Sequence, residues 1–360
     1  MIVTIKAEIF NNLRNHSDLN DLMFFFRKGK HRLNLKKKED FDAFNDSEWT
    51  RALTLSDKDI LKESISRVDK KEIIISNSGL NDEFNIKEAV NYLQQNLRII
   101  LEHEEYEKPF ILKIFQEFDL SNELIISLQQ GWLEFYNGAG SNSQSILRTR
   151  LTRDITTNQY FKDPLKKYLR FYEIKDSDRE FCIINSNGTI KLQELNISKT
   201  AFLEENQIPY HILYKREKEN YMPDSVFNSF LHTARRNDPL KLFSKIYLKL
   251  NFHQKDFFDL EKGFEVPRSN PRQLKERGEL KVEVRNLFSN INDKSYRTIG
   301  FGLPFPNFKS EFSKKFENVN KKDLESRIKH QPKFKSIVNP LDKTERNEFE
   351  HIVHEIKYLL

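Results

Sequence analysis

Apolar runs that are typical of buried strands alternate with amphipathic segments along the middle of the chain. Residues 97–101 (Leu-Arg-Ile-Ile-Leu) end at Glu102, and apolar residues then recur at helical spacing from 111 to 118, after a proline at 109 that suits a first helical turn. Further strands are predicted at 131–136, within 166–179 and at 210–214, with helices at 143–150 and 201–206. This alternation predicts an α/β fold with a mostly parallel sheet that helices cover on both faces.

The N-terminal residues show a different pattern. Strands are predicted at 2–5 and 72–76, and Ser56-Asp57-Lys58-Asp59 has the residues of a helix start. The apolar run 22–26 leads into the basic residues 27–32, and the two runs are alternatively a hairpin with a solvated turn. Asn85-Ile-Lys-Glu88 resembles a capping box that opens a helix through Leu93.

Beyond Pro223 the chain is mostly helical and basic in pattern. Prolines and glycines between Phe264 and Gln331 predict loops, and a last helix is predicted at about 343–360. We therefore expect three parts, which are an N-terminal α+β lobe at 1–85, an α/β domain at 86–224 and a mainly α-helical lobe at 225–360.

Composition narrows the class of protein only slightly. The 60 Lys and Arg residues against 54 Asp and Glu give a net charge of +6, which fits a polyanionic partner but is also common in proteins without one. No run approaches the roughly 20 apolar residues of a membrane span, and no signal sequence opens the chain. The single cysteine, Cys182, excludes an internal disulfide framework and a cysteine-based zinc site. We expect a cytoplasmic protein with no membrane partner.

Three carboxylates are predicted at the ends of strands in one sheet. Glu102 follows the strand at 97–101, and Asp176 and Asp178 stand where the strand in 166–179 breaks into Asp-Ser-Asp. Open α/β sheets bind ligands beyond the carboxyl ends of their strands, and clustered carboxylates suit Mg²⁺ or Mn²⁺. The alternative is that the two aspartates form an Asx turn and that Glu102 lies in a solvated loop.

The region from Leu97 to Tyr221, about a third of the chain, resembles the Toprim fold of topoisomerases, primases and nucleases of bacterial phage defence. That family has a glutamate after its first strand and Asp-x-Asp after its third, which match Glu102 and Asp176-Ser-Asp178. The small-residue turn Gly138-Ala-Gly140 resembles the turn after the second strand. Residues 210–223, with Lys-Arg-x-x-Glu-Asn-Tyr, are similar to the defence-associated branch, including the overcoming-lysogenization-defect nucleases.

The chain departs from the family pattern at two positions. His103 stands where many members have glycine after the glutamate, which concerns the tightness of the first turn. Tyr106 stands at the fourth position after Glu102, where an acidic residue is expected, although Glu105 and Glu107 flank it. The second departure bears on a second metal site.

Charged residues near the predicted acids suggest further roles. Glu217 and Glu219 follow a strand and could add a metal ligand or a base, or they could only cap and fix the exit from that strand. Four basic residues stand beside the acids in sequence and are expected to bind phosphate. They are Lys175, Arg179, Lys215 and Arg216.

Two other sequence patterns bear on metal binding and ATP hydrolysis. His351 and His354 suggest a zinc site, but the His-Glu-x-x-His order of a zincin is absent and two histidines without a further fixed ligand rarely form one. No Gly-x-x-x-x-Gly-Lys-Ser/Thr loop occurs, which excludes ATP hydrolysis by that route.

The resemblance implies a metal-dependent endonuclease that hydrolyses phosphodiester bonds in DNA or RNA, with Mg²⁺ or Mn²⁺ held by Glu102, Asp176 and Asp178. It further implies a toxic effector of antiphage defence that works with a partner ATPase. The alternative is a non-catalytic nucleic-acid-binding or sensor subunit on a Toprim scaffold, and a plain protein–protein scaffold is a third class. The sequence is also compatible with a homo-oligomer.

Overall fold

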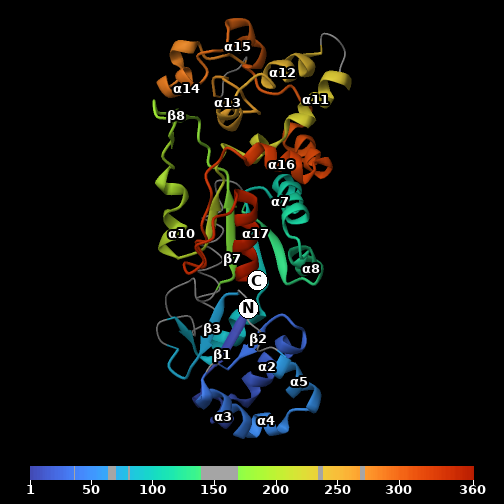
Figure 1. The fold of residues 1–360 in the computed structure, drawn as a ribbon, viewed down its shortest axis with the longest axis vertical. Coiled ribbons are helices and arrows are strands. Elements are labelled where there is room, and N and C mark those ends of the chain that lie inside the picture. The colour runs from blue at the N-terminus through green and yellow to red at the C-terminus, as the bar shows by residue number, and fades with distance from the viewer. Residues whose placement is uncertain (36, 64–69, 80–81, 139–168, 234–237, 268–271) are drawn as a thin grey trace.

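The computed structural model describes the chain except for residues 36, 64–69, 80–81, 139–168, 234–237 and 268–271. Figure 1 shows an elongated molecule with an N-terminal α/β part, a central parallel sheet and a helical part at the far end. Both sheets of four strands are parallel and flanked by helices, so the predicted mixed α/β class is confirmed. Among the described residues, no helix is both long and apolar enough to cross a membrane.

The N-terminal part is built on a sheet in the order β2-β1-β3-β4. Its strands, all paired in parallel, are β1 (Ile2–Ile5), β2 (Arg32–Asn34), β3 (Glu72–Ile75) and β4 (Glu83–Phe84). Its helices are α1 (Ala7–Phe10), α2 (His16–Arg27), α3 (Lys38–Asp46), α4 (Glu48–Ala52) and α5 (Leu55–Glu63). All four strands are paired in parallel and occur together with helices, so this part has an α/β arrangement in place of the predicted α+β.

The apolar run 22–26 lies in α2, in neither a strand nor a hairpin. Leu19, Leu22, Met23 and Phe26 are buried, and their spacing of three and four residues places them on one face of the helix. Phe24 points away from that face and is 54% exposed. A short apolar run fits a strand and a buried helix equally well, so only the wider spacing identifies the helix.

The predicted capping box opens α6 (Ile86–Gln94). The N–H of Glu88 donates to Oδ1 of Asn85 at 3.0 Å, and the N–H of Asn85 donates to Oε2 of Glu88 at 3.0 Å. Ala89 and Leu93 of this helix are buried in the N-terminal core. The N-terminal part therefore continues through α6, past the boundary expected at residue 85.

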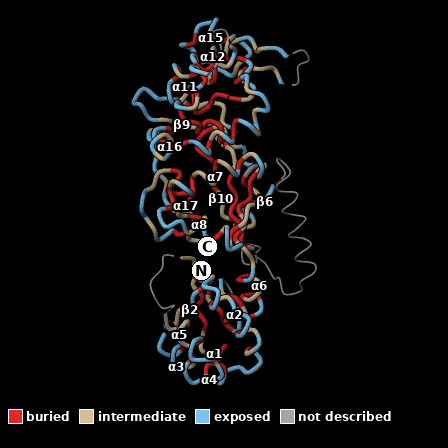
Figure 2. The backbone as a smooth tube through the Cα atoms, turned by 90° about the vertical axis from the view of Figure 1, so that its right-hand side faces the viewer, coloured by how far each residue is buried: buried red, intermediate tan, exposed pale blue. Residues whose placement is uncertain are grey.

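The central sheet has the order β10-β7-β5-β6, with every neighbouring pair parallel. Its strands are β5 (Leu97–Leu101), β6 (Leu133–Asn137), β7 (Phe171–Lys175) and β10 (Tyr210–Ile212). Ile99 packs in the same cluster as α7 (Glu104–Phe118) and α8 (Glu123–Gln129), whereas Ile100 packs against α10 (Ala201–Glu205). Adjacent residues of β5 thus point to opposite faces, with α10 on one side of the sheet and α7 and α8 on the other (Figure 1), and Figure 2 shows the buried residues gathered along the inside of this part.

Three details of the central part differ from the predictions or extend them. Pro109 lies inside α7, because the helix already begins at Glu104. An antiparallel hairpin of β8 (Cys182–Ile184) and β9 (Ile190–Leu192) follows β7. The helix predicted at 143–150 and the turn residues Ala139 and Gly140 lie outside the described residues.

The C-terminal part contains more helix than predicted. Its helices are α11 (Asp224–Thr233), α12 (Pro239–Tyr247), α13 (Phe252–Phe257), α14 (Val282–Leu287), α15 (Asp293–Ile299) and α16 (Lys321–Ile328). The region expected as loops holds the last three of these. Among the described residues, Gly300, Gly302, Pro304 and Pro306 fall between α15 and α16, so they separate these two helices without preventing them.

The last helix, α17 (Glu348–Leu359), returns to the central sheet instead of staying with the C-terminal helices (Figure 1). Phe349 packs in the same cluster as β5 and α7. The end of α17 meets the N-terminal part, where Nζ of Lys70 donates to the carbonyl of Lys357 at 2.8 Å. Cations at the C-terminus of a helix are favourable because they satisfy its free carbonyls and oppose its dipole.

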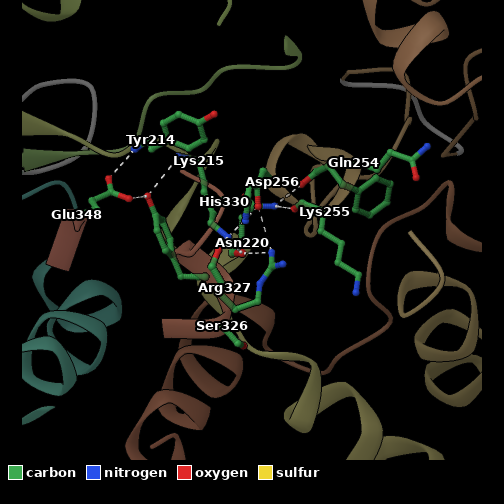
Figure 3. Close-up of polar contacts among 12 residues, drawn as sticks. Tyr214, Lys215, Asn220, Gln254, Lys255, Asp256, Ser326, Arg327, His330 and Glu348 are labelled. Atoms are coloured by element: carbon green, nitrogen blue, oxygen red, sulfur yellow. Dashed lines mark hydrogen bonds and ion pairs between the residues drawn. The ribbon is translucent and has the colours of Figure 1, made fainter. Parts of the chain in front are cut away.

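Glu348 fixes α17 to the strand β10. Its carboxylate is fully buried and accepts hydrogen bonds from the N–H of Tyr214 at 2.7 Å and from the hydroxyl of Tyr221 at 2.6 Å. Nε2 of His211 lies 2.9 Å from the same carboxylate. Figure 3 shows Glu348 beside Tyr214. This buried charge is thus satisfied only in the folded arrangement.

We predict that Glu348→Gln lowers the free energy of unfolding by about 2–4 kcal/mol, because an amide cannot serve all the donors that face the carboxylate. Glu345→Gln is the matched control, since Glu345 is exposed and paired only loosely with Lys335 at 3.4 Å. It should change stability by less than about 0.5 kcal/mol. Urea unfolding of both variants measures the difference, and equal losses would contradict the assigned role of Glu348.

Candidate functional site

Glu102 and Asp176 follow neighbouring parallel strands at one edge of the central sheet. Leu101 of β5 pairs with Ile174 of β7, so the chain leaves both strands side by side. Glu102, Asp176 and a third residue, Glu107, bring carboxylate oxygens within 4.8 Å of one another. We name these three side chains the acidic cluster. The structure thus brings together two of the three acids expected to converge, and Glu107 joins them in place of Asp178.

Glu107 reaches the cluster because it folds back over the start of α7. Its carboxylate accepts the N–H of Glu102 at 3.0 Å and the N–H of His103 at 3.2 Å, two groups at the N-terminal end of the helix. Burial raises the pKa of Glu107 to about 7, with a further increase from Glu102 and a decrease from Lys218. The side chain therefore titrates near neutral pH.

Lys218 places a positive charge among the acids. Its Nζ lies 3.4 Å from Glu107, 3.9 Å from Asp176 and 3.4 Å from Glu219, and its backbone N–H donates to Oδ1 of Asp176 at 3.0 Å. Burial alone would lower the pKa of Lys218, but the surrounding carboxylates raise it well above its usual value. Burial also raises the pKa of Asp176, and Lys218 opposes that shift. The lysine is thus the counter-ion of the acidic cluster.

The Asp-Ser-Asp turn separates its two aspartates. Asp178 has a left-handed backbone (φ 53°), its side chain is exposed, and its N–H donates to the carbonyl of Arg216 at 2.9 Å. The hydroxyl of Ser177 donates to the carbonyl of Lys215 at 2.6 Å. These bonds fasten the turn to the segment after β10, and Asp178 is not one of the residues of the acidic cluster.

The four basic residues expected to bind phosphate already have partners. Lys175 pairs with the buried Glu173 at 2.9 Å, and Arg216 pairs with Asp259 at 2.7 Å. The guanidinium of Arg179 donates to backbone carbonyls of residues 193, 213 and 214. Each of these three side chains therefore makes contacts within the fold, and its role in phosphate binding stays a prediction.

Lys215 is the most deeply buried of the four basic residues. It is fully buried, and its Nζ lies 2.8 Å from Asp256, which also contacts Arg327 at 3.3 Å (Figure 3). The same Nζ donates to the carbonyl of Arg327 at 2.8 Å and stands over the ring of Tyr221. Burial and the neighbouring Arg327 lower the pKa of Lys215 to about 7. A lysine at the centre of such a network is not available to a substrate.

Glu217 and Glu219 have mainly local roles. Glu217 forms a capping box with Asn220, whose Oδ1 accepts the N–H of Glu217 at 3.0 Å. Burial, with Asp259 and Glu219 nearby, raises the pKa of Glu217 to about 8. Glu219 is buried beside Lys218. Glu217 therefore supports the exit from β10, and Glu219 completes the charge balance around the lysine.

His351 and His354 do not form a three-ligand metal group among the described residues. The ring of His351 is buried against those of His211 and Phe334. Nε2 of His354 lies 3.0 Å from Asp342. His351 therefore packs in the core, and His354 pairs with Asp342.

Sequence reasoning noted Glu107 only as a neighbour of an expected acidic position, and it assigned no role to Lys218. A usable signal existed for Glu107, since acids in the first turns of a helix often bind back to its free N–H groups. For Lys218 the sequence offered only a basic residue between two glutamates, a pattern that also describes solvated turns.

The donor set of the acidic cluster fits a hard divalent cation. Ligands of one Mg²⁺ lie about 2.0–2.1 Å from the ion, so two of them are separated by no more than about 4.2 Å. The three carboxylates are within 4.8 Å of one another before any ion is bound, so small movements suffice. The negative charge that Lys218 leaves uncompensated on the three carboxylates attracts a cation. That cation has to compete with Lys218 for the same carboxylates.

The raised pKa of Glu107 predicts a pH-dependent stability. Between about pH 4.5 and 7 the folded chain keeps a proton that the unfolded chain releases, so this contribution to stability is lost as the pH rises through that window. Glu107→Gln should show a smaller loss of unfolding free energy between pH 5 and 8 than the wild type, measured by urea unfolding without divalent ions. Glu105→Gln, at an exposed position on the same helix, should follow the wild type. An unchanged slope in Glu107→Gln would refute this assignment.

Comparisons with known proteins identify no relative, since no protein-family model, no curated protein and no solved structure matches the chain. The function is therefore inferred from the side chains themselves. The side chains used for this inference are those of the acidic cluster at the carboxyl ends of β5 and β7, together with Lys218, their counter-ion.

Proposed function

We propose that the protein is a metal-dependent nuclease that hydrolyses phosphodiester bonds in DNA or RNA. The observation that carries this proposal is the acidic cluster, in which three carboxylates converge at the carboxyl edge of a parallel sheet. Sites of this composition hold Mg²⁺ or Mn²⁺ and direct it at phosphoryl oxygens. The Toprim resemblance supports the same function, because Glu102 and Asp176 occupy the expected positions after two adjacent strands.

In this proposal Glu102, Glu107 and Asp176 hold the ion. When bound, the ion supplies an activated water and stabilises the charge that develops on the phosphoryl group. Glu107 has to lose its proton before it can ligate, which its pKa of about 7 allows near neutral pH. Lys218, whose ammonium lies 3.4 Å from Glu107 and 3.9 Å from Asp176, would then be a donor for a phosphate oxygen.

A role in antiphage defence with a partner ATPase is part of the same proposal. It rests on the resemblance of the segment from Tyr210 to Pro223 to defence-associated Toprim proteins. The chain carries no phosphate-binding loop of the Gly-x-x-x-x-Gly-Lys type, so hydrolysis of ATP by that route would fall to the partner.

A second candidate is a non-catalytic nucleic-acid-binding or sensor subunit on the same scaffold. The observation that favours it is Lys218, whose ammonium is paired with Glu107, Asp176 and Glu219 and compensates part of their charge. In that case the lysine would replace the metal permanently, and the acids would serve only to position the loops around the sheet edge.

A cleavage assay on mixed DNA and RNA with Mg²⁺ or Mn²⁺ tests the proposal. Asp176→Asn should reduce cleavage by at least about 100-fold, because it removes a charged ligand, while the amide oxygen can still accept the N–H of Lys218. Glu105→Gln is the control, since Glu105 is exposed on α7 and outside the acidic cluster. It should cleave like the wild type. Cleavage that persists in Asp176→Asn would refute the catalytic role of the cluster.

The two candidates differ in their response to the ion. A nuclease should bind Mn²⁺ in a calorimetric titration and lose that binding in Asp176→Asn, whereas a sensor subunit should bind nucleic acid without binding Mn²⁺ at the cluster. Both should bind nucleic acid more weakly as salt increases, with a log–log slope of about 0.7–0.9 per neutralised phosphate. An affinity that does not change with salt would contradict both.

A further inference from the structure

A second group of potential metal ligands lies in the C-terminal part and shares no residue with the acidic cluster. His253 and Asp256 stand three residues apart on α13, and His330 follows the end of α16. Each offers one ligand atom, and the three atoms lie within 4.8 Å of one another. We propose that these side chains bind one divalent transition-metal ion of the zinc class, which links α13 to α16.

The two oxygens of Asp256 face different partners. Oδ1 lies 2.8 Å from Nζ of Lys215 and 3.3 Å from Nη2 of Arg327, whereas Oδ2 lies 2.5 Å from Nε2 of His330 (Figure 3). One oxygen is thus held by two cations, and the other is directed toward an imidazole. Outer contacts of this kind orient the carboxylates that ligate metals.

The elements that carry the ligands are fixed independently of any ion. The start of α13 is held by a capping box in which Asn251 and Gln254 exchange hydrogen bonds at 2.9 and 3.1 Å. The ring of Phe252 stacks on that of His330, with centroids 4.8 Å apart and an interplanar angle of 20°. The imidazole plane and the helix start are therefore set before an ion binds, which lowers the entropic cost of ordering the site.

Hydrogen bonding alone leaves the two imidazoles incomplete. Nδ1 of His253 and Nδ1 of His330 are both buried, and neither has a hydrogen-bond partner in the described part of the chain. A buried polar atom without a partner calls for an explanation such as an ion or an ordered water. An ion ligated by Nδ1 of His253 would supply one for that ring, whereas His330 would ligate through Nε2, the nitrogen that faces Asp256.

The ligand types select the class of ion. Two imidazole nitrogens and one carboxylate oxygen suit Zn²⁺, which takes ligands at about 2.0–2.2 Å in tetrahedral geometry, whereas Mg²⁺ prefers oxygen alone. Tetrahedral ligands at these distances lie about 3.4 Å apart. The ring of His330 has to move about 1 Å from Oδ2 as the ion replaces the hydrogen-bond proton. The side chain of His330 is 14% exposed, so water can take the fourth position.

The test uses the full chain without a histidine tag, stripped of metal with a chelator and titrated calorimetrically with Zn²⁺ in excess Mg²⁺. We expect one Zn²⁺ at this site and a higher melting temperature in its presence. His253→Gln and His330→Gln should each weaken that binding at least about tenfold and abolish the thermal shift. Both variants leave Asp256 with Lys215 and Arg327, so the buried charge stays paired.

Two controls separate this site from others. His354→Gln removes an imidazole that also lies beside a carboxylate, that of Asp342 at 3.0 Å, but that belongs to no three-ligand group among the described residues. Asp176→Asn disables the acidic cluster. Both should bind Zn²⁺ like the wild type. Failure of the wild type to bind Zn²⁺, or binding that survives in both His253→Gln and His330→Gln, would overturn the proposal.

Discussion

The buried ion pair between Lys215 and Asp256 holds the central sheet to the C-terminal helices. Both side chains are fully inaccessible to solvent, and Arg327 contacts the same carboxylate oxygen. Burial alone would raise the pKa of Asp256, but Lys215, His330 and Arg327 lower it to about 2, so the carboxylate stays ionised. Removal of one partner from such a pair typically costs about 3–5 kcal/mol, because the remaining charge is left uncompensated. The pair therefore fixes the segment after β10 against α13 and α16.

That segment, residues 215–221, connects the other parts of the molecule. Lys215 faces the C-terminal helices, Lys218 faces the acidic cluster, and the hydroxyl of Tyr221 reaches Glu348 on α17. The amide of Asn220 donates to two carbonyls at the end of α13, each at 2.8 Å. One short stretch thus sets the position of the candidate site relative to three separate helices.

The charge balance at the acidic cluster determines what the site can do. Lys218 keeps the carboxylates together without an ion, and it also occupies the electrostatic role that an ion would take. In the proposed nuclease, metal binding would therefore exchange one counter-ion for another and would be coupled to release of the proton on Glu107. A nuclease needs that exchange to be favourable, whereas a binding subunit does not, so the competition between lysine and metal decides between the two proposed functions.

The sequence by itself determined the elements whose causes are local. The strands β5, β7 and β10 follow from short apolar runs, and the capping box Asn85–Glu88 follows from residues three apart. It also indicated that Glu102 and Asp176 would meet, because parallel strands end at a common edge. Only the tertiary structure decided which other side chains join them. Lys218 and Glu107 are 111 positions apart, Asp256, the partner of Lys215, lies 41 positions away on α13, and the N–H of Asp178 is bound to the carbonyl of Arg216. Periodicity and caps are set within about four residues, whereas the partner of a buried charge is chosen by packing between distant segments.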